Sequence, residues 1–317
     1  MSSALQETQS GRREMKVYNK LNRISIPANL IITTMFIIGS LMSIIPALFV
    51  VAISITEETS IGVYGYQLIP HAFSLKAYEY MFKVKDYILP SLTVTVLRTL
   101  CGTLLGLLLN ATMAYPLSRR TLPFRNFFSW FIFLPMLFNG GMVSSYLVNT
   151  RLLNLRDTFA VLVIPQAVGT FTIILMRTFF QNTVPEEIIE SAKMDGARQI
   201  TILSRIILPL SLPVMATVGL MLSFSYWNEW FTGLLYLTTN RQDLYPLQYV
   251  LMSLERQIDF LNQNPLLASY DPSLRARIPA EGSRMAIVVL TILPIACSYP
   301  FFQRYFISGL TVGSVKG

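Results

Sequence analysis

The sequence predicts an all-α membrane protein with six transmembrane helices. Apolar residues make up 53% of the 317 positions and charged residues 13%, and the mean hydropathy is +0.51. A soluble globular domain carries about 25% charged residues, so this composition excludes that class. A transmembrane helix needs about 20 mostly apolar residues. Six stretches meet this requirement, at about 28–55, 88–115, 126–148, 158–180, 212–238 and 285–307.

The first apolar stretch starts late and is too long for the core of a cleavable signal peptide. We therefore expect it to remain as a membrane anchor. It follows a polar N-terminal arm, residues 1–27. A six-span domain is expected over 28–308, and a short tail over 309–317 ends the chain.

The distribution of Lys and Arg predicts the orientation of the spans, because short loops rich in these residues stay in the cytoplasm. Such residues occur in the N-terminal arm, between the second and third stretches (Arg119, Arg120, Arg125) and before the fifth stretch (Lys193, Arg198, Arg205). Both termini are then cytoplasmic. Segments 56–87, 149–157 and 239–284 are expected to face outward.

This asymmetry also explains the net charge of +8, and the basic arm is expected to meet anionic headgroups at the membrane surface. Nucleic acid is not an expected partner. The two cysteines and the single histidine, His71, lack the spacing of a metal site or a disulfide framework. No metal ion or cofactor is therefore expected. The spans also lack a close catalytic set of side chains, which argues against an intramembrane enzyme.

The second stretch contains Arg98 about ten residues from its start. A charge at this depth is costly and too deep to reach water easily. We expect it to pair with an acidic side chain or a backbone carbonyl. Direct contact with a transported substrate is the alternative.

The third stretch is expected to bend, because Pro135, Asn139, Gly140 and Gly141 weaken a regular helix. Bent spans often line cavities. Asn139 is therefore a candidate for the wall or gate of a transport pathway. Close packing of the glycines between helices is the alternative.

A polar segment at about 184–208 separates the fourth and fifth stretches. Thr183 and Glu186 have the spacing of a helix-capping box, which predicts a short helix from about Val184. The helical period predicts one packing face and one polar face. The packing face holds Ile188, Ile189 and Ala192, and the polar face holds Glu186, Glu190 and Lys193.

Gly196 is expected to form the turn that follows this short helix. A second amphipathic helix is expected from about Ala197, with packing residues that include Ile200. Pro209 and Pro213 should interrupt it at the start of the next apolar stretch. The whole segment is predicted to be a pair of cytoplasmic helices.

Three groups of residues in this segment resemble the EAA signature of ABC importer permeases: Glu190-Ser191-Ala192, Asp195-Gly196-Ala197 and Ile207-Leu208-Pro209. Ser191 replaces the usual middle alanine, and a small residue is retained. The signature precedes the penultimate span, as it does in that family.

Further residues resemble the maltose-permease G-type branch, including permeases of lipoprotein-linked oligosaccharide importers. The resemblance runs over nearly the whole chain. It is carried by Ala114-Tyr115-Pro116-Leu117-Ser118-Arg119, by Tyr226-Trp227-Asn228-Glu229-Trp230, by Gly309-Leu310-Thr311 and by the terminal Gly313-Ser314-Val315-Lys316-Gly317.

The resemblance implies a type I ABC importer permease fold, an oligosaccharide substrate and a bacterial-type inner membrane. It implies three kinds of protein partner: a second homologous permease, two ATPase subunits and an extracellular or periplasmic sugar-binding protein. ATP and magnesium are expected on the ATPases, because this chain lacks a G-x-x-x-x-G-K-[ST] loop. The residues implied in coupling to the ATPases are Glu190, Ser191, Ala192, Asp195, Gly196, Ala197 and Lys316.

The alternative interpretation of the polar segment is a helical hairpin whose charged side chains only contact solvent. Replacing Gly196 distinguishes the two, because only a coupling element should affect ATP-driven uptake.

The fifth stretch contains Trp227, Asn228, Glu229 and Trp230. Flat rings beside hydrogen-bonding groups suit a sugar, so these residues, with Asn139, are candidates for the substrate pathway. Anchoring at the membrane interface is the alternative for the tryptophans. The outer segment 239–284 is expected to be a long polar loop that meets the binding protein, or alternatively a mobile linker.

The sequence therefore predicts a permease subunit and not an enzyme. The rival class is a secondary transporter or channel driven by ion gradients. Such proteins usually show paired repeats with broken spans in matching halves, and no such pairing is visible.

Overall fold

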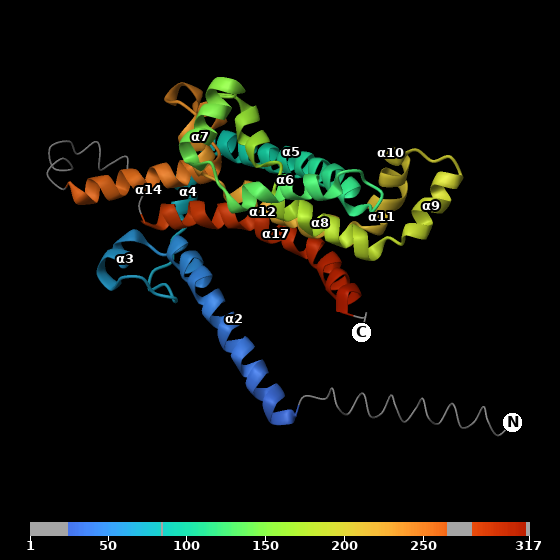
Figure 1. Ribbon diagram of the computed structural model, residues 1–317. Coiled ribbons are helices and arrows are strands. Elements are labelled where there is room, and N and C mark those ends of the chain that lie inside the picture. Colours follow the sequence, from blue (N-terminus) through green and yellow to red (C-terminus); the bar gives the residue numbers. More distant parts are fainter. Residues whose placement is uncertain (1–24, 84, 265–280, 315–317) are drawn as a thin grey trace.

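The computed structural model describes residues 25–83, 85–264 and 281–314. This part of the chain is helical and contains no β-strand, only an isolated bridge between Thr56 and Phe73 (Figure 1). The α-helices are α2 (Ile26–Ser54), α3 (Glu58–Tyr64), α4 (Lys76–Lys83), α5 (Lys85–Ser118), α6 (Arg125–Leu137), α7 (Gly141–Leu147), α8 (Thr170–Thr183), α9 (Glu186–Met194), α10 (Gln199–Ile202), α11 (Leu208–Leu210), α12 (Leu212–Asn228), α13 (Phe231–Tyr236), α14 (Leu247–Gln263) and α17 (Glu281–Ser314). The short 3-10 and π segments are η1 (Val148–Leu152), η2 (Phe159–Leu162), η3 (Ile164–Gln166), η4 (Leu203–Ile207) and η5 (Thr239–Leu244).

Two described helices are long and apolar enough to cross a membrane without a break, namely α2 and the Ile88–Ser118 part of α5. Both contain proline, at Pro46 in α2 and at Pro90 and Pro116 in α5. Membrane helices tolerate proline where neighbouring groups satisfy the freed carbonyls. The sixth predicted stretch lies within α17, which has 34 residues.

Three further apolar regions are pairs of helices joined by a sharp bend. Arg125–Leu137 and Gly141–Leu152 meet at 116°, Phe159–Gln166 and Thr170–Thr183 at 50°, and Gln199–Leu210 and Leu212–Asn228 at 84°. If each pair is one span, the described part holds up to five. The predicted bend of the third stretch is confirmed, because Asn139 Oδ1 accepts the Gly141 amide at 2.8 Å and Gly141 has φ +82°.

The core lies where α5, α8 and α12 pack together. Glycines of α5 allow the close approach of α12. A Cβ atom on Gly102 would lie 2.4 Å from the Tyr226 ring, and one on Gly106 would lie 2.8 Å from Leu222. The buried residues around this crossing include Met176, which contributes from α8. Small residues at helix crossings are a common packing device in membrane proteins.

Helix α2 leaves this bundle at an angle, and most of its length has no neighbour in the chain (Figure 1). Its apolar side chains are accordingly exposed, with Phe36 at 71%. Only its C-terminal end packs, through the buried Ala52 and Ile53, and its partner helix is α17. An apolar surface of this extent suits lipid or another membrane subunit.

The region predicted as a long polar loop at 239–284 contains an ordered helix, α14, so that prediction is wrong for residues 247–263. Residues at helical spacing, Leu247, Val250, Leu251 and Leu254, pack it on the bundle. The Leu247 amide donates to Thr95 Oγ1 at 2.8 Å. The polar residues of this region favoured the loop prediction, although the apolar period is present in the sequence.

Glu58, in the segment after α2, contacts the start of α17. Its carboxylate accepts the amides of Glu281 at 3.0 Å and Gly282 at 3.2 Å, which begin α17. A carboxylate at a helix N-terminus satisfies free amides and stabilises the helix dipole. The segment after α2 is thereby tied to the last long helix.

Candidate functional site

The polar segment predicted as coupling helices forms α9, a turn and α10, and these lie at one end of the bundle (Figure 1). Helix α9 begins at Glu186, with Glu186 and Glu187 in its first turn, where the helix dipole favours negative charge. The predicted capping box is wrong: Thr183 ends α8, and no side chain caps α9. The cause is Pro185, because a residue before proline avoids helical angles, and Val184 is extended (φ −106°, ψ 104°).

The turn between the two helices is confirmed at Gly196, which has φ +80°. The Ala197 amide donates to the Ala192 carbonyl at 2.9 Å, and the Gly196 amide donates to the Lys193 carbonyl at 3.0 Å. This pair of hydrogen bonds is a Schellman motif, in which the left-handed position favours glycine. Ala192 and Ala197 both pack against the main core cluster. The signature residues therefore define one helix terminus.

The faces of α9 differ from the prediction at one position. Ile189 is buried and Ala192 packs on the core, as expected, but Ile188 is 42% exposed. Ile200 of α10, also expected to pack, is 75% exposed. Met194 at the end of α9 is 89% exposed. The segment thus presents an apolar surface that the chain itself does not cover.

The charged residues of the same surface are also free of internal partners. Glu190 and Asp195 are exposed and form no ion pair within the part of the chain that the structure describes. Ser191 is exposed beside them. Exposed apolar side chains bordered by charged groups are typical of a surface that binds another protein.

Helix α10 is attached to the end of α5. The Tyr115 hydroxyl and Gln199 Oε1 lie 2.6 Å apart, and Ile202 and Ile207 are fully buried. Arg119 donates through Nη2 to the Phe180 carbonyl at 3.2 Å, which ties the same end of α5 to α8. The end of α5 and the start of α10, which are far apart in the chain, are therefore in direct contact.

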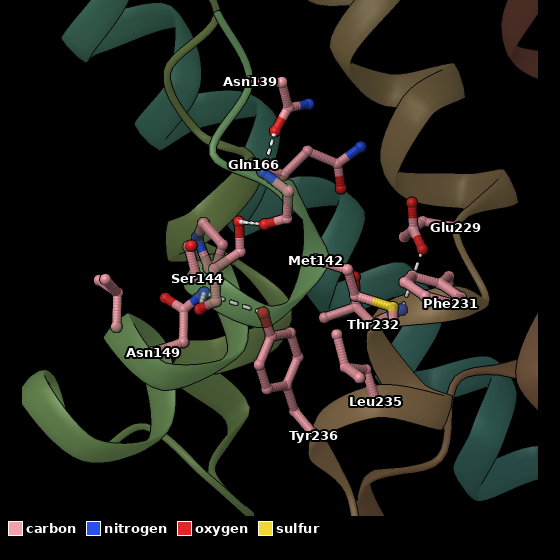
Figure 2. Close-up of a pocket in the computed structure, with 14 residues that line it drawn as sticks. Asn139, Met142, Ser144, Asn149, Gln166, Glu229, Phe231, Thr232, Leu235 and Tyr236 are labelled. Atoms are coloured by element: carbon pink, nitrogen blue, oxygen red, sulfur yellow. Dashed lines mark hydrogen bonds between the residues drawn. The ribbon is translucent and has the colours of Figure 1, made fainter. Parts of the chain in front are cut away.

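A second candidate site is a cavity of about 700 Å³ beside the bends of the third and fourth predicted spans and the break between α12 and α13 (Figure 2). Segments α7, η1, η3 and α13 contribute to its wall. The polar lining residues are Asn139, Ser144, Ser145, Asn149, Gln166, Glu229, Thr232 and Tyr236. Met142, Phe231 and Leu235 contribute apolar surface. Such a mixture suits a ligand with hydroxyl groups and apolar faces.

Glu229 is held at this wall by the break between α12 and α13. Its Oε1 accepts the Thr232 amide at 3.0 Å, and its backbone carbonyl accepts Arg98 Nη1 at 3.0 Å. Arg98 is completely buried, and its guanidinium lies 5.9 Å from the Tyr226 ring centre. The prediction that Arg98 has a carbonyl or acidic partner is confirmed. Arg98 therefore stabilises the broken end of α12.

The other wall is also fixed by hydrogen bonds. Asn149 Nδ2 donates to the Ser145 carbonyl at 2.9 Å and to the Tyr236 hydroxyl at 3.0 Å (Figure 2). The rings of Tyr146 and Tyr236 stack at 5.8 Å. These contacts join η1 to α13 across the cavity wall.

The remaining predicted pathway residues lie outside the cavity lining. Trp227 is only 5% exposed, and its Nε1 donates to the Thr291 carbonyl at 3.0 Å. Asn228 is exposed and donates to the Phe224 carbonyl, while the Trp230 ring lies 5.5 Å from the Arg256 guanidinium. Lys316 lies outside the described residues. The pathway roles of Trp227, Asn228 and Trp230 and the coupling role of Lys316 stay predictions.

Asn110 is a residue that the sequence reasoning missed. It is fully buried in α5 and serves the break before α8: its Nδ2 donates to the Ala167 carbonyl at 2.8 Å, and its Oδ1 accepts the Gly169 amide at 3.2 Å. Thr172 Oγ1 also donates to this oxygen at 2.7 Å. The available signal was a lone asparagine in an apolar span, where polar residues are costly.

The charge around the large cavity is also informative. Among its 14 lining residues Glu229 is the one charged group, and none is Lys, Arg or His. In the described ranges no group of three or more His, Cys, Asp or Glu is placed to hold a metal ion. The cavity therefore offers hydrogen-bonding groups and not a cationic or metal centre.

Comparison with known proteins adds the following. Residues 99–312 match the family described as binding-protein-dependent transport system inner membrane component. Protein LplC of Bacillus subtilis is 38% identical over 277 residues, covering 87% of this chain and 90% of that protein. The polygalacturonan/rhamnogalacturonan transport system permease protein YtcP of the same organism is 36% identical over 278 residues, covering 88% and 94%.

The structure is similar to a chain in the crystal structure of a bacterial ABC transporter involved in the import of the acidic polysaccharide alginate. The TM-score is 0.75 at 27% sequence identity, and the match covers 90% of this chain and 99% of that chain. The overall fold is therefore one that a chain of a solved transporter shares.

Proposed function

The chain belongs to the family of binding-protein-dependent transport system inner membrane components, and we propose that it is the permease subunit of an ABC importer that takes up oligosaccharides. The observation that carries this proposal is the family match together with an exposed segment made of α9, the Gly196 turn and α10, here called the coupling segment. The subunit conducts substrate and is not an enzyme. ATP hydrolysis belongs to the partner ATPase subunits.

The proposed topology has six spans, made by α2, by α5, by the bent pairs Arg125–Leu137 with Gly141–Leu152 and Phe159–Gln166 with Thr170–Thr183, by α12 with α13, and by α17. The length and composition of α2 and of Ile88–Ser118 support two of these directly. The basic residues Arg119, Arg120 and Lys193 favour a cytoplasmic position for the end of the bundle that holds α9. Both chain termini are then cytoplasmic, in a bacterial inner membrane.

The exposed surface of α9, the turn and α10 is the proposed docking site for an ATPase subunit. Ile188, Met194 and Ile200 supply apolar contacts, and Glu190 and Asp195 supply charges without internal partners. Buried apolar area at the centre of an interface contributes most of its binding energy. Movement of the ATPases then acts on α5, α8 and α12 through the buried side of the same segment.

The proposed complex contains a second, homologous permease, two ATPases and an extracellular or periplasmic sugar-binding protein. The exposed apolar length of α2 supports contact with another membrane subunit or with lipid. ATP and magnesium are assigned to the ATPases.

The cavity beside Glu229 is the proposed part of the sugar pathway in this subunit. Neutral hydrogen-bonding groups and the Phe231 ring suit sugar hydroxyls and ring faces. We propose that Asn139 and Glu229 contact substrate, and that Trp227, Asn228 and Trp230 shape the break that presents Glu229. YtcP is named for transport of polygalacturonan and rhamnogalacturonan. The transporter of similar structure is involved in the import of alginate.

Glu229→Gln tests the pathway. The change retains the size of the side chain and an acceptor for the Thr232 amide, and it removes the charge. If Glu229 accepts sugar hydroxyls, the half-saturating substrate concentration for uptake should rise roughly tenfold, since hydrogen bonds to charged groups contribute about 1.5–3 kcal/mol. The matched control is Glu255→Gln, on α14 outside the cavity. Equal uptake by both variants would remove Glu229 from the pathway.

Purification tests the class as a whole. The tagged chain, expressed with its own partners, should bring down a homologous permease and a P-loop ATPase, and the reconstituted complex should take up sugar only with ATP. Active transport by the purified chain without ATP would instead support the ion-driven alternative, which the comparisons do not favour.

A further inference from the structure

A second cavity, of about 510 Å³, lies between the end of α5 and the coupling segment. Three parts of the chain line it. The end of α5 contributes Tyr115 and Arg119, the following loop contributes Leu122, and the coupling segment contributes Lys193 and Ile200. The cavity thus bridges a transmembrane helix and the element assigned to the ATPase.

The charges of this cavity are all positive. Arg119 and Lys193 are its charged lining residues, and no acidic residue lines it. Arg119 donates through Nε to Ser118 Oγ at 2.9 Å and through Nη2 to the Phe180 carbonyl at 3.2 Å, which leaves Nη1 without a described acceptor. Lys193 forms no ion pair with any residue that the structure describes. Two cationic groups therefore face one cavity, and neither forms an ion pair with a described residue.

The protonation of Arg119 does not remove this charge. Burial lowers its pKa, and Tyr115 and Glu186 act in the opposite direction. Because a guanidinium stays protonated far above neutral pH, the side chain stays charged at neutral pH. The fixed geometry of its two protein hydrogen bonds orients the remaining donor.

Apart from Thr112, Thr121 and Gln199, the rest of the lining is mainly apolar and adjoins the membrane. Leu122, Ile200 and Leu203 line the cavity, and Ile88–Ser118 is the adjoining span. Arg119 is the first residue after that span, at the depth where lipid headgroups lie. A ligand that matches both parts has an anionic phosphate and an apolar chain. Free phosphate would leave the apolar lining uncovered.

We propose that this cavity binds an anionic phospholipid, whose phosphate bridges Arg119 on α5 to Lys193 on α9. The bound lipid holds the coupling segment against the span and so adjusts how firmly ATPase movement is transmitted. The proposal rests on the proposed function in one respect, because that function places this end of the bundle at the cytoplasmic leaflet, where anionic lipids attract basic side chains.

Native mass spectrometry of the purified complex tests the proposal, with phosphatidylglycerol and phosphatidylcholine as the added lipids. Lys193→Gln loses no described hydrogen bond, and phosphatidylglycerol affinity should fall roughly fivefold; for Arg119→Gln with Lys193→Gln it should fall roughly thirtyfold. The matched control is Arg198→Gln with Arg205→Gln, which removes two exposed basic residues of the same segment outside the cavity. The control should keep wild-type affinity.

Three results would overturn the lipid site. Equal loss in the control would indicate diffuse attraction to a basic surface, and no loss in any variant would exclude the two cations. Displacement of phosphatidylglycerol by millimolar inorganic phosphate would assign the cavity to a free anion. Lipid counts are also measurable on the solubilised chain without ATPases. Failure of ATPase copurification would therefore refute the proposed function without affecting this test.

Discussion

Replacing Gly196 with alanine tests whether the turn of the coupling segment carries force. Gly196 has φ +80°, and a Cβ atom at this position would meet no atom within 4 Å. The cost is therefore backbone strain alone, about 1–2 kcal/mol for a residue with a Cβ atom in the left-handed region. Other conformations of the turn become about fivefold to thirtyfold more populated. The fold should survive, because total stabilities are about 5–15 kcal/mol.

The assay is uptake per ATP hydrolysed by the complete complex in proteoliposomes, normalised to the amount of assembled complex. We expect this ratio to fall about fivefold or more in Gly196→Ala. Gly196→Asn should recover most of it, because asparagine tolerates the left-handed region better than alanine does. ATPase binding should remain measurable in both variants.

The matched control is Gly65→Ala. Gly65 has φ +73° and equally open space, but it lies after α3, far in the bundle from α9 (Figure 1). Gly65 has ψ −165°, in a region that is essentially restricted to glycine, so Gly65→Ala carries at least as much backbone strain as Gly196→Ala but at a different place. If both give the same uptake per ATP, the Gly196 turn has no special part in coupling and the reasoning fails.

Three further changes follow from individual contacts. Tyr115→Phe removes the hydroxyl contact to Gln199 of α10, which contributes about 0.5–1.5 kcal/mol. Uptake per ATP should fall severalfold in the assembled complex, and an unchanged ratio would contradict this. Glu58→Ala frees the first amides of α17 and should speed their hydrogen exchange about fivefold, a loss of about 1 kcal/mol; unchanged exchange would show that the cap is not formed. Gly102→Ala places a Cβ atom 2.4 Å from the Tyr226 ring and should destabilise the protein by about 1–3 kcal/mol in thermal unfolding. Gly219→Ala places its Cβ atom 3.5 Å from the nearest atom and should be nearly neutral. Equal unfolding midpoints for the two variants would refute the packing argument.

Local rules predicted the features that depend on one segment. The six apolar stretches, the bend near Gly141 and the turn at Gly196 each follow from the composition of a few neighbouring residues. The same rules failed where two local signals compete. Thr183 and Glu186 have capping-box spacing, but Pro185 between them forces Val184 into an extended conformation, so α8 and α9 meet without a cap.

Other features depend on tertiary contacts, which the local sequence signals did not specify. The break before α8 exists because Asn110, 57 residues earlier than Ala167, satisfies the freed backbone groups. Helix α14 has a clear apolar period, yet its burial depends on α5 and α17. The roles of Ile188 and Ile200 also required the structure, since the sequence did not distinguish packing inside the chain from packing on a partner.

These tertiary contacts converge on one helix, α5. Arg98 holds the break after α12, Asn110 holds the break before α8, and Tyr115 holds α10 of the coupling segment. Arg98 and Tyr115 are 17 residues apart, so about 26 Å of continuous helix separates the cavity beside Glu229 from the coupling segment at 1.5 Å per residue. Because a broken span can move only if its freed backbone groups keep partners in both states, these side chains of α5 are the points at which movement of the coupling segment would reach the cavity wall.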